Sequence, residues 1–560
     1  MHDDQHIARL FLLAKGISEG QLYPRWVDML GFGFGYPLFN FYPPLIYYVS
    51  LVFHFFGFSY IWSVKLMIIT GFVLAALGMF YLVKEALGKA SAYLGAAAYT
   101  YFLYHSVTVY IRGALAEFFT LAILPFVFLG LIKLAKKVNL NSSLFFGVSL
   151  ALLVLSHPLI AFPSLIFIGI LFILLFLANN QKTKFILLTM FSGLLSLGLS
   201  AFFWLPSMVE RKYTLVDQIL TKELASYKDH FIYLQQLWYS PWGYGGSTPG
   251  TGDGLTFQLG KIPIFLLVVS IFLAFAYFIQ KKEFDKYIKM YAASIFLLFV
   301  SLFMTTSYSS FIWDNIKYLW YMQFPWRFLT FTNIFISTSI AFSAFFVKEL
   351  INRTSDQYKK YRQTLINLLV LLAIVVIGFK YYQYFKPQKL INTSDQKRTN
   401  FQEIAWRISS TSYEFVPNKV ATKKTSLGTT TLAINEVDLP ISPFKIISGQ
   451  ATTSIQKNLF ADKEFNISAG SLTIFQLNTY NFPGWQASID GHKVTINSNN
   501  KLDLITISVP KGKHRLKFEF TDTLIRKIAD YTSLISLILL LVIFSYSIQK
   551  SLIRINKINR

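Results

Sequence analysis

The sequence predicts a polytopic α-helical membrane protein with an extracytoplasmic antiparallel β-sandwich domain before its last span. Three observations predict this fold class: long apolar runs, basic connections that alternate with less basic ones, and one long polar segment near the C-terminus. Hydrophobic residues make up 54% and aromatic residues 18% of the 560 residues, and the mean hydropathy is +0.46. Soluble domains rarely carry so much aromatic material in uninterrupted runs.

Apolar runs that could span a membrane occur about eleven times. They cover residues 61–83, 90–105, 118–135, 142–157, 159–178, 185–205, 261–280, 290–306, 327–347, 364–383 and 528–548. Several are shorter than the roughly 20 residues that a perpendicular helix needs, so their boundaries are approximate.

The charges between these runs predict the topology. The connections 84–89, 133–137, 182–184, 281–289 and 348–362, together with the tail 550–560, hold 20 Lys/Arg against 5 Asp/Glu. The connection 206–260 holds 4 Lys/Arg against 5 Asp/Glu. By the positive-inside rule, the basic set faces the cytoplasm. The net charge of +24 is therefore mainly an orientation signal and requires no nucleic acid.

The same topology divides the chain into four parts. They are an outer loop of catalytic type (1–60), a multi-span domain with an outer loop at 206–260 (61–383), an extracytoplasmic β-domain (384–527), and a last transmembrane helix with a basic cytoplasmic tail (528–560). The N-terminus lies outside without a signal peptide, so we expect a first transmembrane helix to be missing and Met1 to be an internal start or a truncation. The run 43–57 is too short for a span, and we expect it to lie in the interface or to re-enter the membrane.

The segment 384–527 shows the alternation of short strands. Ser488–Ile496 reads as a hairpin around Asp490-Gly491, and residues 504–509 and 514–520 continue the alternation. The aromatic residues Tyr480, Phe482 and Trp485 have two interpretations. They could stack on sugar rings, or they could form part of the domain core, which is the more common role of such residues.

The first sixty residues carry the strongest functional signal. Asp3 and Asp4 stand near His6 and Arg9, and the aromatic stretch GFGFGYP–FNFYPP follows, which favours a folded functional loop over a solvated tail. Adjacent carboxylates can supply a general base or hold a divalent cation. Arg25 and Trp26 lie in the same loop.

Three further clusters stand at predicted outer ends of spans, and each has a structural alternative. Arg112 could bind substrate or anchor a headgroup, whereas Glu117 lies deeper in an apolar run, where a carboxylate is harder to explain without a function. His157 between serine and proline could be functional or a hydrogen-bonded turn. Trp326-Arg327 could be an interface anchor, although arginine is also the usual partner of a phosphate.

Several chemistries have no support in the sequence. The chain has no cysteine, so a disulfide framework and a thiolate zinc site are excluded. It has no P-loop, no H-E-x-x-H and no G-x-S-x-G motif.

Together, the motifs HDDQHIARL, GQLYPRWVDMLGFGFGYPLFNFYPPL, YIRGALAEFF, LSHPLIAF and QFPWRFL resemble a family of bacterial multi-spanning membrane proteins labelled "6-pyruvoyl-tetrahydropterin synthase-related". A pterin-synthase zinc site would need a histidine triad, which the sequence does not show. The closing NFPGWQASIDGHKVTI resembles the outer β-domain of membrane glycosyltransferases that decorate cell-envelope polymers. The resemblance covers nearly the whole chain and implies the GT-C superfamily, whose members take a sugar from a polyprenyl phosphate at the outer membrane face.

The resemblance also implies roles for particular residues. An acidic residue of the first outer loop is the catalytic base in that superfamily, and this position corresponds to Asp3 and Asp4. If a divalent cation is used, Mg²⁺ or Mn²⁺ would bind these two carboxylates; no cofactor is otherwise implied. The substrate-binding candidates are His6, Arg25, Trp26, Arg112, Glu117, His157, Trp326 and Arg327.

The function expected from these observations is inverting transfer of a sugar from a polyprenyl-phosphate donor to a glycan or another envelope polymer. The protein would lie in the bilayer of the bacterial cytoplasmic membrane. One alternative is a lipid or solute transporter or flippase, which should show internal repeats and polar groups near the bilayer midplane. The other is a non-catalytic glycan-binding envelope protein, for which Asp3 and Asp4 would be dispensable.

Overall fold

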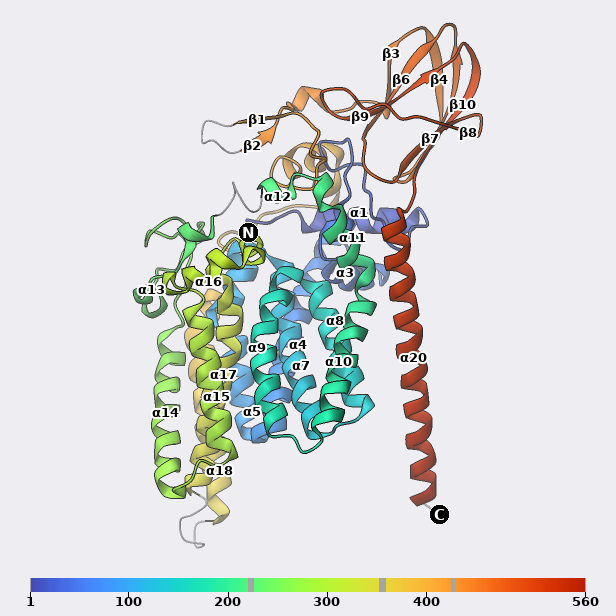
Figure 1. Ribbon diagram of the computed structural model, residues 1–560. Coiled ribbons are helices and arrows are strands. Elements are labelled where there is room, and N and C mark those ends of the chain that lie inside the picture. The colour runs from blue at the N-terminus through green and yellow to red at the C-terminus, as the bar shows by residue number, and fades with distance from the viewer. Residues whose placement is uncertain (1, 220–225, 352–358, 425–429, 559–560) are drawn as a thin grey trace.

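The computed structural model describes residues 2–219, 226–351, 359–424 and 430–558. A bundle of long helices makes up one half of the molecule, and a β-sandwich stands beyond one end of it (Figure 1). The N-terminal segment and several short helices form a layer between the two. The predicted fold class is confirmed. Parts of the predicted segments 206–260, 348–362, 384–527 and 550–560 lie outside the described residues.

Each predicted apolar run contains a helix. In the described part of the chain, nine helices are long and apolar enough to cross a membrane. They are Tyr60–Leu87 (α4), Leu115–Lys136 (α7), Pro158–Leu177 (α9), Lys182–Leu199 (α10), Lys261–Lys281 (α14), Lys286–Phe303 (α15), Pro325–Ile351 (containing α17, Leu329–Ile351), Tyr361–Tyr384 (overlapping α18, Lys359–Tyr381) and Leu524–Ser547 (within α20, Leu524–Ile558).

Two of the predicted spans correspond to shorter helices, and a third is divided. Helix α5 (Lys89–Thr100) ends early because the backbone at Phe102 is extended, after which α6 (Leu103–Ser106) and the π-helix η1 (Val107–Arg112) follow. Helix α8 (Leu140–Ser156) has 17 residues. The predicted run 185–205 is divided at Ser200 into α10 and α11 (Ala201–Glu210).

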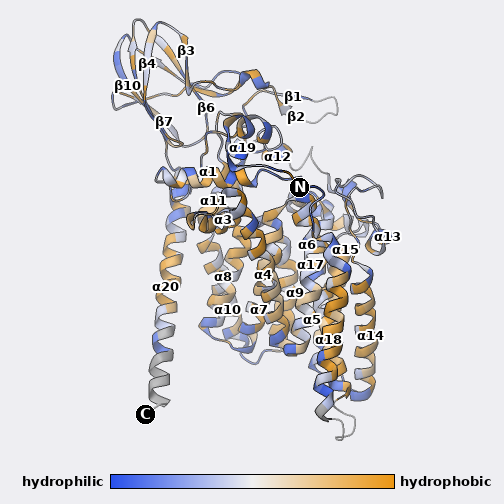
Figure 2. Ribbon diagram, turned by 180° about the vertical axis from the view of Figure 1, so that it is seen from behind, coloured by the Kyte–Doolittle hydropathy of each residue, from blue (hydrophilic) through white to orange (hydrophobic). Residues whose placement is uncertain are grey.

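The basic connections gather at one end of the bundle. The connections after α4, α7, α9 and α14, and the end of α20, lie remote from the sandwich (Figure 1). Figure 2 shows hydrophilic residues at this end and hydrophobic residues along the helices. The alternation of charge in the sequence therefore corresponds to a separation of charge between the two ends of the bundle.

The N-terminal segment covers the other end of the bundle. It forms α1 (His6–Ser18), α2 (Leu38–Phe41) and α3 (Leu45–Phe55), so the predicted loop 1–60 contains three helices. Helix α3 occupies the run 43–57 and packs on α1 and α4. The connection 206–260 contributes α12 (Val216–Gln218) and α13 (Leu234–Trp238), and α16 (Ser310–Asn315), η6 (Lys317–Met322) and η7 (Pro325–Phe328) precede α17.

The GFGFG sequence forms a tight turn that joins this layer to the β-domain. Val27 and Tyr36 pair across the turn by two backbone hydrogen bonds of 2.9 and 3.2 Å. Phe34 is buried against Tyr480, whose backbone N–H donates to the Phe34 carbonyl at 3.0 Å. Gly35 has a φ of 75°, and a Cβ there would lie 2.7 Å from Trp26 Nε1, so only glycine fits.

The β-domain is a sandwich of two antiparallel sheets. The five-stranded sheet has the order β4-β5-β10-β7-β8, and the three-stranded sheet has the order β3-β6-β9. The strands are β3 (Phe444–Ser448), β4 (Ala451–Asn458), β5 (Asp462–Ala469), β6 (Thr473–Tyr480), β7 (Trp485–Ile489), β8 (His492–Val494), β9 (Leu504–Val509) and β10 (Gly512–Phe520). Phe465, Phe475 and Phe518 pack between the sheets. A small hairpin, β1 (Thr422–Lys424) and β2 (Thr430–Leu432), precedes the sandwich, as do α19 (Asp395–Thr399) and the π-helix η10 (Glu403–Ile408).

The predicted hairpin is present. Asp490 and Gly491 have φ values of 51° and 84°, the left-handed pair that a two-residue turn between β7 and β8 requires. The predicted strands at 504–509 and 514–520 correspond to β9 and β10, which lie in different sheets, so the turn between them carries the chain across the sandwich.

Tyr480, Phe482 and Trp485 lie between the sandwich and the N-terminal layer. All three are buried, and Trp485 meets Trp26 edge-to-face at a centroid distance of 5.6 Å. Of the two interpretations from the sequence, the structure matches the core role.

We predict that Gly35→Ala lowers the melting temperature of the purified protein more than Gly20→Ala does. Gly20 also has a positive φ, of 91°, but no atom lies within 4 Å of its added Cβ. The control therefore carries only the left-handed backbone cost, about 1–2 kcal/mol, whereas the Gly35 variant adds a steric clash. Equal melting temperatures for the two variants would contradict the close packing at Gly35.

Candidate functional site

A buried carboxylate with two arginines forms the centre of the candidate site. The chain leaves η1 at Gly113, whose φ of 70° is left-handed, and α7 begins at Leu115, which brings Arg112 back over the first turn of α7. Arg112 Nη1 donates to Glu117 Oε2 at 2.7 Å. Arg327, in η7, places its Nε 3.1 Å from the same oxygen. These three residues are called the Glu117 cluster below.

The neighbours of the Glu117 cluster fix its geometry. The Tyr104 hydroxyl donates to Glu117 Oε1 at 2.5 Å, and Arg327 Nη1 donates to the Met322 carbonyl at 2.6 Å. The Arg112 guanidinium lies 4.6 Å from the centre of the buried Trp326 ring. Within these three residues two cations face one carboxylate, and the neighbouring Asp3 carboxylate acts on both arginines as a second negative charge.

The two arginines of the Glu117 cluster have further hydrogen-bond donors. Within the described residues, neither Arg112 nor Arg327 donates a hydrogen bond from its Nη2 group. Guanidinium groups with free N–H donors are suited to a phosphate or carboxylate ligand. The cluster can therefore bind an anion.

Asp3 lies beside this cluster with its carboxylate unpaired. Its backbone N–H donates to the Arg112 carbonyl at 2.8 Å, and the His2 N–H donates to the Ile111 carbonyl at 2.9 Å. The Asp3 carboxylate is half-buried, and it interacts electrostatically with Arg112 and Arg327. It makes no hydrogen bond or ion pair with the described part of the chain.

The Asp4 carboxylate, unlike that of Asp3, forms ion pairs. It lies 2.9 Å from Arg407 and 3.5 Å from Arg398, and both arginines also pair with Glu403 at 2.6 and 2.9 Å. Asp4 therefore fastens the N-terminal segment to α19 and η10. The two adjacent carboxylates, which the sequence leaves equivalent, are distinguished by these contacts.

His6 joins α1 to the turn after η1. Its Nε2 lies 2.7 Å from the Gly113 carbonyl and its Nδ1 lies 3.0 Å from the Tyr47 hydroxyl. Burial, with a contribution from the positive charge of Arg9, lowers the pKa of His6 to about 4. The ring is therefore neutral at pH 7, with Nε2 donating to the carbonyl and Nδ1 accepting from Tyr47.

His157, between α8 and α9, belongs to the same region. It interacts electrostatically with Arg327 and Glu117, and its buried Nδ1 has no hydrogen-bond partner among the described residues. Of the predicted site residues, Asp3, Arg112, Glu117, His157, Trp326 and Arg327 thus come together, and His6 lies on the adjoining turn.

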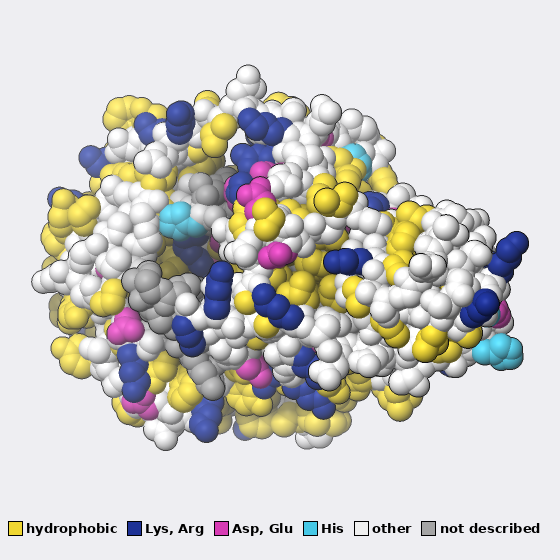
Figure 3. Space-filling view, turned by 90° about the horizontal axis from the view of Figure 1, so that it is seen from above, with side chains coloured by type: hydrophobic (Ala, Val, Ile, Leu, Met, Phe, Trp, Pro, Cys, Tyr) yellow, Lys and Arg dark blue, Asp and Glu magenta, His cyan; other side chains and the backbone are white. Residues whose placement is uncertain are grey.

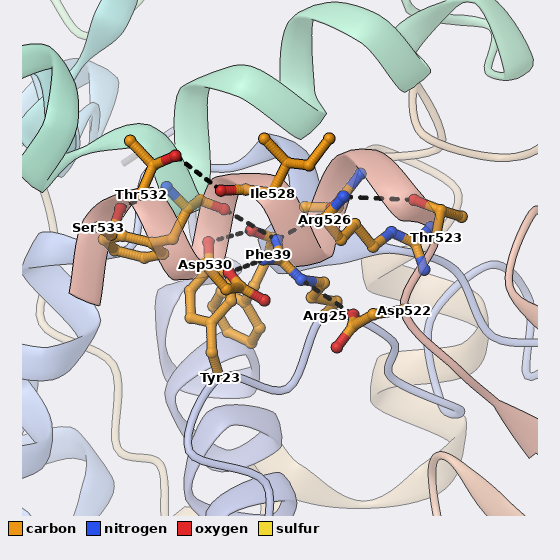
Figure 4. Close-up of polar contacts among 12 residues, drawn as sticks. Tyr23, Arg25, Phe39, Asp522, Thr523, Arg526, Ile528, Asp530, Thr532 and Ser533 are labelled. Atoms are coloured by element: carbon orange, nitrogen blue, oxygen red, sulfur yellow. Dashed lines mark hydrogen bonds and ion pairs between the residues drawn. The ribbon is translucent and has the colours of Figure 1, made fainter. Parts of the chain in front are cut away.

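Arg25 and Trp26 lie in a separate junction. Arg25 Nη2 donates to Asp530 at 2.6 Å, and its Nε lies 3.6 Å from Asp522 (Figure 4). Trp26 is buried among the aromatic rings of the sandwich seam. No contact in the described chain joins either residue to the Glu117 cluster. This junction connects the N-terminal layer to the start of α20.

The described residues contain no group of three or more His, Cys, Asp or Glu side chains placed to hold a metal ion. The pair Asp3–Asp4 does not fit a shared cation, because the Asp4 carboxylate is bound by two arginines.

Arg9, which stands beside Asp3, Asp4 and His6 in the N-terminal motif, is fully buried, donates to Ser412 at 2.7 Å and lies 3.9 Å from Glu414. Burial raises the pKa of Glu414, although Arg9 opposes the shift. Sequence reasoning missed Tyr104 and Arg407. Arg407 lies 403 residues from Asp4, so no local pattern joins the two, and nothing marks Tyr104 among the many tyrosines of the chain as the partner of Glu117.

Seen from the sandwich end, the molecule has a hollow near the middle of this face. Lys, Arg, Asp and Glu side chains gather around it (Figure 3). The N-terminal segment and the connections at this end of the bundle therefore form a polar, charged surface above the apolar helices.

Comparison with known proteins identifies the class of the chain. The sequence model for the family described as "6-pyruvoyl-tetrahydropterin synthase related domain; membrane protein" matches residues 39–386. No curated protein matches the chain at a significant level.

We predict that Glu117→Gln destabilises the protein by about 3–5 kcal/mol, because it leaves two buried arginines without their counter-charge. Glu85→Gln is the matched control. It removes an exposed ion pair with Lys136 at 3.0 Å and should cost about 0–1 kcal/mol. Thermal and denaturant melts in the same detergent compare the two. A Glu117 variant as stable as the Glu85 variant would show that this pairing is not needed for stability.

Proposed function

The chain belongs to the 6-pyruvoyl-tetrahydropterin synthase-related family of membrane proteins, and we propose that it is a membrane glycosyltransferase. It transfers a sugar from a polyprenyl-phosphate donor to a glycan or another envelope polymer. The observation that carries the proposal is the unpaired Asp3 carboxylate beside the anion-binding Glu117 cluster, where the helix bundle meets the outer layer. The resemblance of the motifs to the GT-C superfamily supports the same activity.

The proposed reaction needs a base and a site for the leaving group. The acceptor hydroxyl attacks the anomeric carbon while the bond from that carbon to the phosphate oxygen breaks. Asp3 takes the hydroxyl proton, and the electron pair leaves with the polyprenyl phosphate. Arg112 and Arg327 stabilise the charge on that phosphate. A single displacement of this kind inverts the anomeric centre.

The other residues around the site have supporting roles in this proposal. Glu117 holds the two arginines at fixed positions, so little reorganisation is needed when the phosphate binds. His157 and Trp326 line the same region, and His6 fixes the turn that carries Arg112. Asp4 holds the peptide that bears Asp3 in place. Arg25 and Trp26 support the junction with α20.

We also propose how the chain lies in the membrane. The donor phosphate is held at the end of the bundle from which the sandwich extends, and its lipid chain lies among the apolar helices. We place the sandwich and the N-terminal layer outside the cytoplasmic membrane and the basic C-terminal tail in the cytoplasm, by the positive-inside rule. The opposite end of the bundle carries the lysine-rich connections.

We predict that Asp3→Asn lowers turnover by at least about a hundredfold, the usual scale for loss of a general base. Release of polyprenyl phosphate from polyprenyl-phosphate sugars by protein in lipid nanodiscs measures this turnover. Asp229→Asn, at an exposed carboxylate of the 206–260 connection, is the control and should keep full activity. Full activity of the Asp3 variant would reject Asp3 as the base.

We also predict the sidedness of the chain. A cysteine introduced at Thr495 should react with a membrane-impermeant maleimide in intact cells, whereas one at Thr183 should react only after permeabilisation. Both positions are exposed, in the sandwich and in the first turn of α10, and the native chain has no cysteine to interfere. The reverse pattern of labelling would overturn the orientation.

A further inference from the structure

Residues 242–257, within the connection 206–260, form a hairpin-like loop, called the hairpin below, whose shape is fixed by glycines. Gly245 N–H donates to the Gly254 carbonyl at 2.8 Å, and Gly254 N–H donates to the Gly246 carbonyl at 2.9 Å. A Cβ on Gly245 would lie 2.9 Å from Gly254 Cα, so the two sides of the hairpin approach too closely for side chains. The Asp253 carboxylate accepts from Thr248 N–H and from Gln236 Nε2, at 2.9 and 2.8 Å. These contacts therefore define the conformation of the hairpin.

This hairpin contacts the segment that carries Asp3 and also the Trp326 ring beside Arg112. His2 Nε2 donates to the Tyr244 carbonyl at 3.0 Å, and His2 directly precedes Asp3 in the chain. At the end of the same segment, the Phe257 ring lies 5.6 Å from the Trp326 ring, which packs under Arg112. The hairpin therefore lies next to the proposed base.

Two aromatic rings stand at the start of the hairpin. Trp242 and Tyr244 are half-buried, with their centroids 6.0 Å apart at 85°, and Trp242 also packs on Tyr384 at 4.8 Å. The Tyr244 hydroxyl donates to the Lys386 carbonyl at 3.0 Å, which holds its ring. The Trp242 indole N–H donates no hydrogen bond within the described chain. Further along the hairpin, no atom lies within 4 Å of an added Cβ at Gly246 or Gly250, so the backbone is open at these two positions.

We infer that Trp242 and Tyr244 form the acceptor subsite and take the face of a sugar ring. This inference rests on the proposed function, because it names the group that receives the sugar. One face of a sugar ring presents C–H groups that pack on aromatic rings, and its hydroxyls can accept from an indole N–H. The Glu117 cluster holds the donor phosphate, so the acceptor approaches Asp3 from the hairpin. The Tyr244 carbonyl accepts from His2, the residue before Asp3, and this contact sets the distance between the Tyr244 ring and the base.

The test uses the full-length protein in nanodiscs and two artificial acceptors, methyl β-D-glucopyranoside and glycerol. Both offer hydroxyls, but only the first has a ring to stack. Trp242→Ala should lower transfer to the glucoside by roughly tenfold, the scale for removing a buried-interface tryptophan, and leave transfer to glycerol unchanged. Trp238→Ala, at a 56% exposed tryptophan of α13 without contact to the hairpin rings, should change neither rate.

A second measurement separates this inference from the proposed function. Saturation-transfer NMR on donor-free protein should show the glucoside bound in the parent and in Trp238→Ala, and a strongly reduced signal in Trp242→Ala. An equal signal in both variants would overturn the subsite, whether or not any transfer occurs. Binding that depends on Trp242, with no release of polyprenyl phosphate to any acceptor, would instead keep the sugar site and reject the glycosyltransferase.

Discussion

A carboxylate buried where a membrane helix begins is the constraint on which the candidate site depends. Glu117 is 1% exposed in the first turn of α7, and an ionised group in such surroundings costs several kcal/mol unless it is paired. Arg112 and Arg327 supply that pairing from two different segments. Each segment departs from regular α-helix to reach it, one through a π-helix and a left-handed glycine, the other through a 3-10 turn. The same pairing leaves the Nη2 groups of both arginines without an acceptor in the described chain, and these are the donors that the proposed phosphate would use.

The N-terminal layer has the second organising role. Its first residues pair with the backbone before Arg112, Asp4 fastens it to η10, and Arg25 fastens it to α20. In the glycine turn, the Phe34 ring packs against Tyr480 of the sandwich. Because the segment is held at so many points, Asp3 has a defined position although its own carboxylate is unpaired. The sandwich therefore stabilises the site by packing on the N-terminal layer. Its residues Tyr480, Phe482 and Trp485 are buried in this junction and do not form a surface on which a sugar could stack.

The sequence predicted those parts of the fold that depend on local patterns. Apolar runs located the helices, charge counts separated the two ends of the bundle, and Asp490-Gly491 located a hairpin. Local patterns could not predict that α5 stops at Thr100, or that residues 6–18 form a helix under the sandwich. They also gave Asp3 and Asp4 the same predicted role as the base, and gave Arg25 the same substrate-binding role as Arg112 and Arg327. Contacts with Arg398, Arg407, Asp522 and Asp530, each hundreds of residues away in sequence, separate these residues into different roles.

A structure of the protein in nanodiscs with bound polyprenyl phosphate would show whether the Glu117 cluster holds the donor phosphate. We expect phosphate density within hydrogen-bonding distance of the guanidinium groups of both Arg112 and Arg327, with the Asp3 carboxylate on the open side of the phosphate. Phosphate density at another place, such as the Arg25 junction, with the Glu117 cluster unoccupied, would contradict it.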